Sequence, residues 1–401
     1  MKTEVHHSES ADNRRLQITL VSERFWPFAG LTELNAGELA AELDRQGHAV
    51  RVVTAKSEKD WPSFLDYRGI PVNRILKTGT GPWATYRHAR RFSRYFSETD
   101  KTDGVLVFGV SMVTNAILRS IGNEKPVIIF INRSLLGVDS VRKIHRRHLE
   151  ALQRCHAIVT DCPTLAAGLN EMAGLPKIHI IPGGSKSSQK TPSLSSQSSA
   201  RAALSAAHPV LGVEAGQPLA MTFLSDNSDA GLVDTIRAWP AVIEHYPKAK
   251  LWVVGDAKLG PQIWQQIGNL DLIQSIIMPG FFDDDSELLL AADLYIHSFR
   301  ASRADSGLIR AMANQRCVLA TSNGWADEFV EPDINGLLVP PASPAALAEA
   351  ILLAFRKPEL RCRLASGAAA TAELRFSLQQ QADRVTKLLR LPSEQPCEST
   401  S

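Results

Sequence analysis

Short apolar runs alternate along the chain with longer stretches whose apolar residues recur at helical spacing. This alternation is typical of parallel sheets that helices cover on both faces. The runs form two series, so we predict two such sheets. The first series predicts strands at 16–21, 50–54, 105–108, 127–131, 157–160 and 178–181, and the second predicts strands at 219–224, 251–254, 276–278, 294–296, 318–320 and 336–339.

A serine-rich stretch separates the two series. Residues 185–200 read S-K-S-S-Q-K-T-P-S-L-S-S-Q-S-S-A, a composition that favours a flexible connector over a packed element. The polar ends of the chain are predicted to be disordered tails. The predicted divisions are a tail at 1–15, a first domain at 16–184, the connector at 185–217, a second domain at 218–375, a terminal helix at 376–391 and a tail at 392–401.

Composition narrows the class of protein. A chain of 401 residues with 44% hydrophobic residues can bury more than one core. Its net charge of +2 is close to neutral, so composition gives no sign of a large basic surface that would bind nucleic acid. The five cysteines are scattered without metal-ligand spacing, which predicts reduced thiols, no metal site and a cytoplasmic location. No apolar run reaches membrane-spanning length, and the N-terminus has no signal-peptide pattern.

Several motifs follow one another in a recognisable order. They are F-W-P-F-A-G-L-T-E at 25–33, I-I-P-G-G at 180–184, Y-P-K-A-K-L-W-V-V-G-D at 246–256, and a long segment at 292–341 that contains I-R-A-M-A and E-P-D-I-N-G-L-L-V-P-P. In this order they resemble the motifs of family 4 (group 1) glycosyltransferases. The resemblance implies the GT-B fold, an α/β architecture of two facing, doubly wound, Rossmann-like parallel-sheet domains with an interdomain cleft. It also implies that the terminal helix returns to the first domain.

The same resemblance implies an activity. Members transfer a sugar with retention from a nucleotide-diphosphate sugar, held by the second domain, to a glycan or lipid-linked acceptor held by the first. They need no metal or other cofactor, because an arginine, a lysine and helix N-termini neutralise the diphosphate leaving group. The expected partners are therefore the sugar donor and the acceptor. No nucleic acid and no transmembrane segment are expected, and peripheral contact with a membrane is left open.

The donor half of the resemblance departs from the family pattern at its charged positions. Ser225 and Ala230 stand where the arginine and lysine belong. Ser302 and Arg310 stand where two glutamates belong, and the alanine-methionine-alanine that follows the second is intact. A guanidinium has no acceptor and cannot replace a glutamate that accepts hydrogen bonds from ribose hydroxyls. The signature is therefore degenerate, and no catalytic residue is assigned.

Arginines cluster at the same place. Arg300, Arg303 and Arg310 crowd the predicted turn between strand and helix, and the last two are seven positions apart on one helical face. One hypothesis is that Arg303 and Arg310 replace the missing cations as donor-binding residues. The alternative is that they form an ordinary solvated surface.

Four other residues stand at positions that belong to the site in the family, and each has two possible interpretations. Gly30 is expected near the donor diphosphate or simply in a tight turn. Leu31 stands where the family has a second glycine, and its side chain is expected either to point toward the donor diphosphate or to pack under the loop. Asn132, where a histidine is common, binds sugar or completes its own turn. Glu328 is expected at the donor site, or complements a helix dipole.

Three functions remain open. The chain is an active glycosyltransferase with rewired phosphate contacts, a catalytically degenerate scaffold or partner of glycan enzymes, or a module that binds a nucleotide-sugar without transferring it. There is no G-x-G-x-x-G after the first predicted strand and no G-x-S-x-G elbow, which argues against a dinucleotide-dependent dehydrogenase and an esterase.

Overall fold

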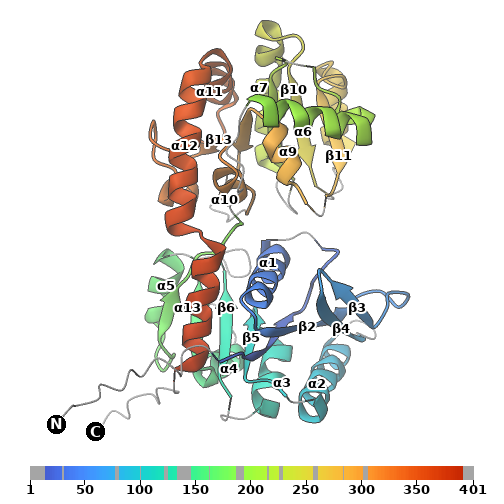
Figure 1. Ribbon diagram of the computed structural model, residues 1–401, viewed down its shortest axis with the longest axis vertical. Coiled ribbons are helices and arrows are strands. Elements are labelled where there is room, and N and C mark those ends of the chain that lie inside the picture. The colour runs from blue at the N-terminus through green and yellow to red at the C-terminus, as the bar shows by residue number, and fades with distance from the viewer. Residues whose placement is uncertain are drawn as a thin grey trace, which may run out of the picture. The chain divides into compact units, whose positions relative to one another are not determined.

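The computed structural model describes residues 14–391, apart from 29–30, 77–80, 100, 122–124, 133–145, 162, 187–193, 215, 225–228, 256–260, 283 and 301–305. The described residues divide between two compact units, one within 14–25, 39–181 and 382–391 and the other within 26–38 and 182–381. Each unit contains one sheet covered by helices (Figure 1). The expected pair of Rossmann-like α/β domains is confirmed.

The first sheet has the strand order β3-β4-β2-β1-β5-β6-β7-β8, and only the β3–β4 pair is antiparallel. Central β1 pairs with strands on both sides, Leu20 lying opposite Val52 of β2 and Leu106 of β5. The strands are β1 (Gln17–Ser22), β2 (Ala49–Lys56), β3 (Phe64–Tyr67), β4 (Ile70–Leu76), β5 (Gly104–Phe108), β6 (Val127–Ile131), β7 (Ala157–Thr160) and β8 (Ile178–Ile180).

Side chains alternate between the two faces of this sheet, as the pleat of a strand requires. Val105 and Val107 of β5 lie in one buried cluster with Phe92 of α2 and Ile117 of α3. Helices α2 and α3 lie side by side (Figure 1). The helices of the first unit are α1 (Leu31–Arg45), which begins in the second unit, α2 (Pro82–Thr99), α3 (Met112–Ile121), α4 (Arg146–Arg154), α5 (Pro163–Asn170) and α13 (Leu378–Arg390), which also begins in the second unit.

The second sheet is entirely parallel, in the order β11-β10-β9-β12-β13-β14. Trp252 and Val254 of β10 point into one core cluster, whereas Leu251 and Val253 point into another on the opposite face. This double burial explains the unbroken apolar runs of the sequence. The strands are β9 (Leu219–Phe223), β10 (Lys250–Val254), β11 (Ile276–Gly280), β12 (Leu294–His297), β13 (Cys317–Thr321) and β14 (Leu337–Val339).

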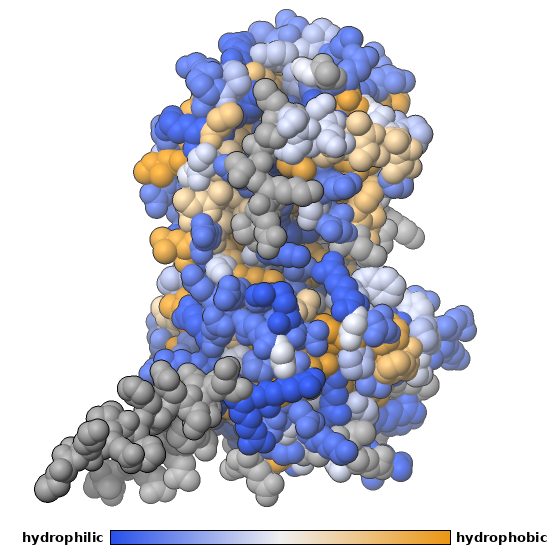
Figure 2. Space-filling view, viewed as in Figure 1, coloured by the Kyte–Doolittle hydropathy of each residue, from blue (hydrophilic) through white to orange (hydrophobic). Residues whose placement is uncertain are grey.

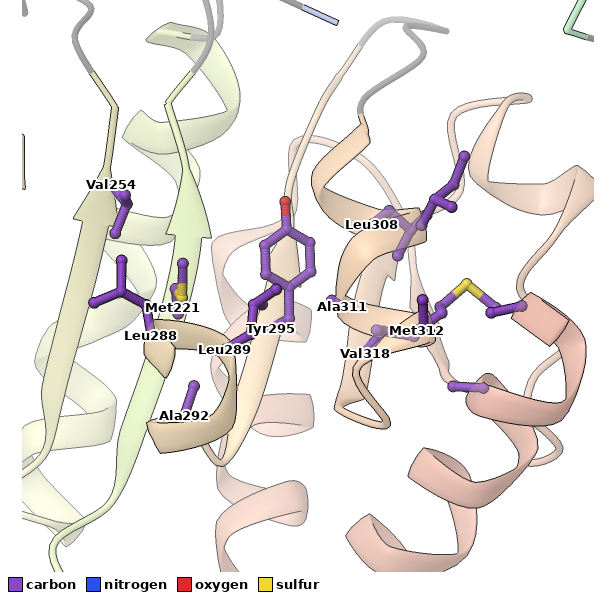
Figure 3. Close-up of a cluster of buried hydrophobic side chains, with 14 of the residues drawn as sticks. Met221, Val254, Leu288, Leu289, Ala292, Tyr295, Leu308, Ala311, Met312 and Val318 are labelled. Atoms are coloured by element: carbon purple, nitrogen blue, oxygen red, sulfur yellow. The ribbon is translucent and has the colours of Figure 1, made fainter. Parts of the chain in front are cut away.

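Helices cover both faces of the second sheet. On the face shown in Figure 3, leucines of α9 and α10 pack beside Tyr295 of β12, whose side chain is fully buried. The helices of this unit are α6 (Leu194–Ala207), η2 (Pro209–Leu211), α7 (Asp229–His245), α8 (Pro261–Asn269), α9 (Ser286–Ala291), α10 (Ser306–Ala313), η3 (Ala326–Glu328), α11 (Pro344–Arg356) and α12 (Pro358–Arg375).

The prediction of an unpacked connector at 185–217 is wrong for its described part. Helix α6 lies in that range, and Leu204 packs in the second core. The buried Arg201 fixes the helix through an ion pair of 2.9 Å with Asp293 and hydrogen bonds to the carbonyls of Ala291 and Gln217. Ser195, Ser198 and Ser199 are exposed on a helix whose other side is docked, which composition alone did not reveal.

The terminal helix α13 has its residues from Ala382 onward in the first unit. Its Leu389 side chain fills the space beside Gly104 of β5, where an added Cβ would lie 2.7 Å from the Leu389 Cδ2. Gln46 also donates a hydrogen bond of 2.8 Å to Asp383. The last helix therefore packs as part of the first unit.

Within the described residues, no helix is long and apolar enough to cross a membrane. Figure 2 shows hydrophilic side chains over most of the visible face, with hydrophobic side chains in smaller areas. The described part of the chain also holds no group of three or more histidine, cysteine or acidic residues that could bind a metal ion.

Candidate functional site

The second sheet has a topological switch point between β9 and β12. The chain leaves β9 toward β10 on one side and later returns to form β12 on the other. Ligands of open α/β sheets bind beyond the carboxyl ends of the strands at such a point. A small pocket lies there, lined by Thr222, Phe223, Leu224, Gly231, Leu232, Val253, Ser298 and Phe299.

The first turns of α7 pack tightly against the segment that follows β12. A Cβ atom on Gly231 would lie 1.9 Å from the carbonyl oxygen of Ser298, so only glycine fits. The Ser298 hydroxyl donates to the carbonyl of Gly231 at 2.9 Å, and the Thr235 hydroxyl donates to the Ser298 hydroxyl at 2.8 Å. The N-terminal part of this helix is therefore held rigidly beside the pocket.

Polar side chains from β13 and the segment after it fix the same loop. Thr321 and Asn323 both donate to the carbonyl of Phe299. The Asn323 Oδ1 accepts from the amide of Ala326 at 2.9 Å and so begins the short helix η3. This helix carries the half-buried Glu328, whose backbone carbonyl accepts from Arg375 at 2.8 Å.

Arg300, which follows β12, pairs with an acid of α7. Its Nε and Nη2 atoms donate to the two carboxylate oxygens of Asp234 at 2.6 and 2.5 Å. Asp234 is 1% exposed, whereas the Arg300 side chain is 41% exposed. The carboxylate raises the pKa of Arg300 by hydrogen bonding and by its charge. A bidentate pair of this kind uses the planar fork of the guanidinium and leaves less of it for a phosphate.

Arg310 of α10 lies over the end of β9. Its Cζ is 4.3 Å from the centroid of the Phe223 ring, and its Nη1 forms an ion pair with Asp285, the residue before α9. Burial lowers the pKa of Arg310 to about 10, opposed by the charges of Glu38 and Asp284. The guanidinium is thus still protonated at neutral pH, but a ring and a carboxylate already surround it.

Not every residue predicted for the site is described. Gly30, Ser225, Ser302 and Arg303 lie outside the described residues, so the hypotheses on them stay predictions. Leu31 and Ala230 belong to the first turns of α1 and α7, but their side chains also lie outside that description.

Of the described positions, Arg310 and Glu328 lie in the second unit, and Asn132 follows β6 in the first, where it is 8% exposed. Among the described residues, two of the predicted cations lie at the switch point. Arg310 lies over the ring of Phe223, and Arg300 pairs with Asp234 of α7.

Sequence reasoning missed the two acids that pair with these arginines. Asp285 lies in the run D-D-D-S before α9, and Asp234 lies three residues after Gly231 in α7. The position of Asp234 on the helix face shared with Gly231 was the available signal, because an acid on a packed helix face requires a partner.

Two family models match the chain. The model described as "Glycosyltransferase Family 4" matches residues 33–186, and the model described as "Glycosyl transferases group 1" matches residues 221–357. The matched segments cover most of the first and the second sheet in turn. The chain belongs to the family 4 (group 1) glycosyltransferases. The predicted family is therefore confirmed for both halves of the chain.

Known proteins are similar to this chain in part of their sequence or in their fold. The chain is 23% identical over 140 residues to the alpha-D-kanosaminyltransferase of Streptomyces kanamyceticus, a match that covers 34% of this chain and 36% of that relative. Its fold is similar to Anabaena HepE in complex with UDP and glucose, with 19% identity, a TM-score of 0.71 and coverage of 94% and 99% of the two chains. Sucrose-phosphate synthase from Thermosynechococcus elongatus gives a TM-score of 0.73 at 19% identity, with coverage of 94% and 98%. At these identities the structural matches show the GT-B fold alone.

Proposed function

We propose that this glycosyltransferase binds a nucleoside-diphosphate sugar at the switch point of its second sheet and transfers the sugar, with retention, to a glycan or lipid-linked acceptor. The single observation that carries the proposal is the rigid packing of α7 against Ser298 beside the pocket. It holds the N-terminal end of a long helix at the carboxyl edge of the sheet, where backbone N–H groups and the helix dipole favour a diphosphate. The complex of HepE with UDP and glucose supports the same class of donor.

One observation favours a second candidate, a protein that holds the nucleotide-sugar without transferring it. Transfer requires fixed positive charge for the departing diphosphate. Arg300 and Arg310, the arginines described at the switch point, each have an acidic partner, Asp234 and Asp285. Each pair has no net charge, so the leaving group meets less positive potential than two unpaired arginines would supply.

Isothermal titration calorimetry with a panel of nucleoside-diphosphate sugars, followed by an assay for hydrolysis and transfer, separates these candidates. Binding with release of the nucleoside diphosphate supports the transferase. Binding without turnover supports the second candidate. If no donor binds to the folded protein, both are wrong and the remaining alternative is a scaffold.

Two variants test the place of binding. Arg310→Gln removes a charge-assisted contact and should weaken donor binding about ten- to a hundredfold if Arg310 turns toward the diphosphate. Asp285→Asn releases Arg310 from its ion pair and should strengthen binding. Arg237→Gln, at an exposed position of α7, is the matched control and should leave affinity unchanged. Equal affinities in all three folded variants would remove Arg310 from the donor site.

A further inference from the structure

Helix α2 of the first unit has two faces of opposite character. On one side His88, Phe92 and Phe96 are at most 4% exposed, and Phe92 and Phe96 pack into the core beneath α3. The His88 and Phe92 rings meet edge to face at 5.0 Å. This side explains why the segment is a helix docked on the sheet. It does not explain the residues on the other side.

Two large aromatic side chains stand on the outer side of the first turns. Trp83 is 79% exposed and Tyr86 is 50% exposed. Their rings contact each other edge to face, with centroids 6.5 Å apart. Tryptophan is rarely so exposed in a soluble domain, and paired exposed aromatics mark an interaction surface more often than an isolated apolar residue does.

Most of the rest of the outer side is basic. Arg87, Arg90, Arg91 and Arg94 are all exposed, and the sequence of α2 has a single acidic residue, Glu98, near its C-terminal end. At about 100° per residue, Trp83 and the arginines at 87, 90 and 94 fall within an arc of about 60°. Tyr86 and Arg91 flank this stripe. The positive charge is therefore concentrated in one line that begins with the aromatic pair, on a chain whose net charge is only +2.

We propose that this face of α2, made of Trp83, Tyr86, Arg87, Arg90, Arg91 and Arg94, binds the surface of an anionic lipid bilayer. Tryptophan and tyrosine place an apolar ring body and a polar edge at the level of the headgroups. Arginines bind headgroup phosphates in forked geometry while their stems cover apolar surface. The buried side of the same helix stays in the core, so the helix lies along the surface and does not insert across it.

The distribution of charge on this face of α2 favours an anionic membrane surface over a nucleic acid as its ligand. A nucleic-acid site needs a basic patch that follows the spacing of phosphates, commonly on a strongly basic domain. Here one narrow stripe is basic, and its aromatic residues meet each other edge to face at one end of the stripe. That arrangement suits a planar anionic interface better than stacked bases.

The test is sedimentation of the full chain with vesicles of phosphatidylcholine, with and without phosphatidylglycerol. We expect binding only to the anionic vesicles, and release as the salt concentration rises. Each arginine near such a surface contributes about a fivefold gain in partitioning. The double variant Arg87→Gln/Arg94→Gln should therefore bind about 25-fold more weakly. The matched control Arg237→Gln/Arg356→Gln, at exposed positions of the second unit, should bind as the unchanged protein does.

A second measurement places the aromatic residues. Brominated lipids quench the fluorescence of tryptophans that enter the headgroup region. Trp83→Phe should remove most of this quenching, whereas Trp264→Phe, which changes another exposed tryptophan, should not. Equal binding to neutral vesicles, equal loss in both arginine pairs, or quenching that survives Trp83→Phe would each overturn the proposal. Binding to soluble heparin but not to anionic vesicles would also overturn it and would assign the stripe to an acidic polymer.

Discussion

Replacing Arg201 by methionine should make α6 open more often from the second unit. Arg201 is 7% exposed and makes its closest contacts with the Asp293 carboxylate and the carbonyls of Ala291 and Gln217, at 2.9, 3.0 and 3.0 Å. Methionine keeps the aliphatic stem and removes every donor. The variant therefore tests whether this guanidinium holds the helix, separately from the apolar packing of Leu204.

The expected loss follows from what remains after the substitution. Removing one partner of a buried ion pair costs about 3–5 kcal/mol. Asp293 keeps three other contacts, to the amide of Leu219 at 2.9 Å, the side chain of Gln197 at 3.0 Å and Arg361 at 4.0 Å. We therefore expect the lower end, about 3 kcal/mol, which corresponds to about a hundredfold change in a local opening equilibrium.

Hydrogen–deuterium exchange of peptides from α6 measures this opening under native conditions. Arg201→Met should accelerate exchange in α6 about a hundredfold. Arg201→Lys keeps a charge without the fork and should give an intermediate rate. The control Arg237→Met, on an exposed part of α7, should leave α6 unchanged. If Arg201→Met exchanges within about twofold of the unchanged protein, the other contacts of α6 hold the helix and the ion pair is not what fixes it.

Other perturbations address the switch point and the first unit. Gly231→Ala drives a Cβ into the Ser298 carbonyl and should lower the unfolding free energy of the second unit by about 3 kcal/mol or more. The control Gly268→Ala, where nothing lies within 4 Å, should raise stability by up to about 1 kcal/mol, and the opposite order of melting temperatures would contradict the steric argument. Burial and the charges of Arg390 and Arg15 lower the pKa of His48 below 6.5. The contribution of neutral His48 to the unfolding free energy is therefore complete above pH 6.5, and it is lost as the pH falls through the pKa of the folded state. The unfolding free energy of the first unit should therefore decline in acid less steeply in His48→Asn, and identical pH profiles by circular dichroism would refute this.

The strands of both sheets could be predicted because parallel strands buried on two faces leave unbroken apolar runs. The predicted run at 127–131 coincides with β6. Strands β3 and β4 were missed, since β3 at Phe64–Tyr67 lies on an edge with alternate residues exposed, and β4 contains Pro71. Edge strands carry a weaker apolar pattern because one side of them faces water.

The candidate site was only partly predictable. The motif register placed Arg310 on the helix after β12, and the structure places its side chain over Phe223 at the switch point. Its partner Asp285 precedes another helix, 25 positions away along the chain, and no local pattern links the two. The same holds for α6, because the pair of Arg201 and Asp293 spans 92 positions. Such contacts arise only when the chain folds, so composition and spacing contain no trace of them.

The pairing of Arg310 with Asp285 has a consequence for any acidic substitution at position 310. Arg310→Glu alone would set two carboxylates against each other beside Phe223, in a largely buried place where like charges repel strongly. The double variant Arg310→Glu/Asp285→Asn removes the nearest of these repulsions and should be less destabilised than Arg310→Glu alone. The effects of substitutions at these two positions should therefore not be additive.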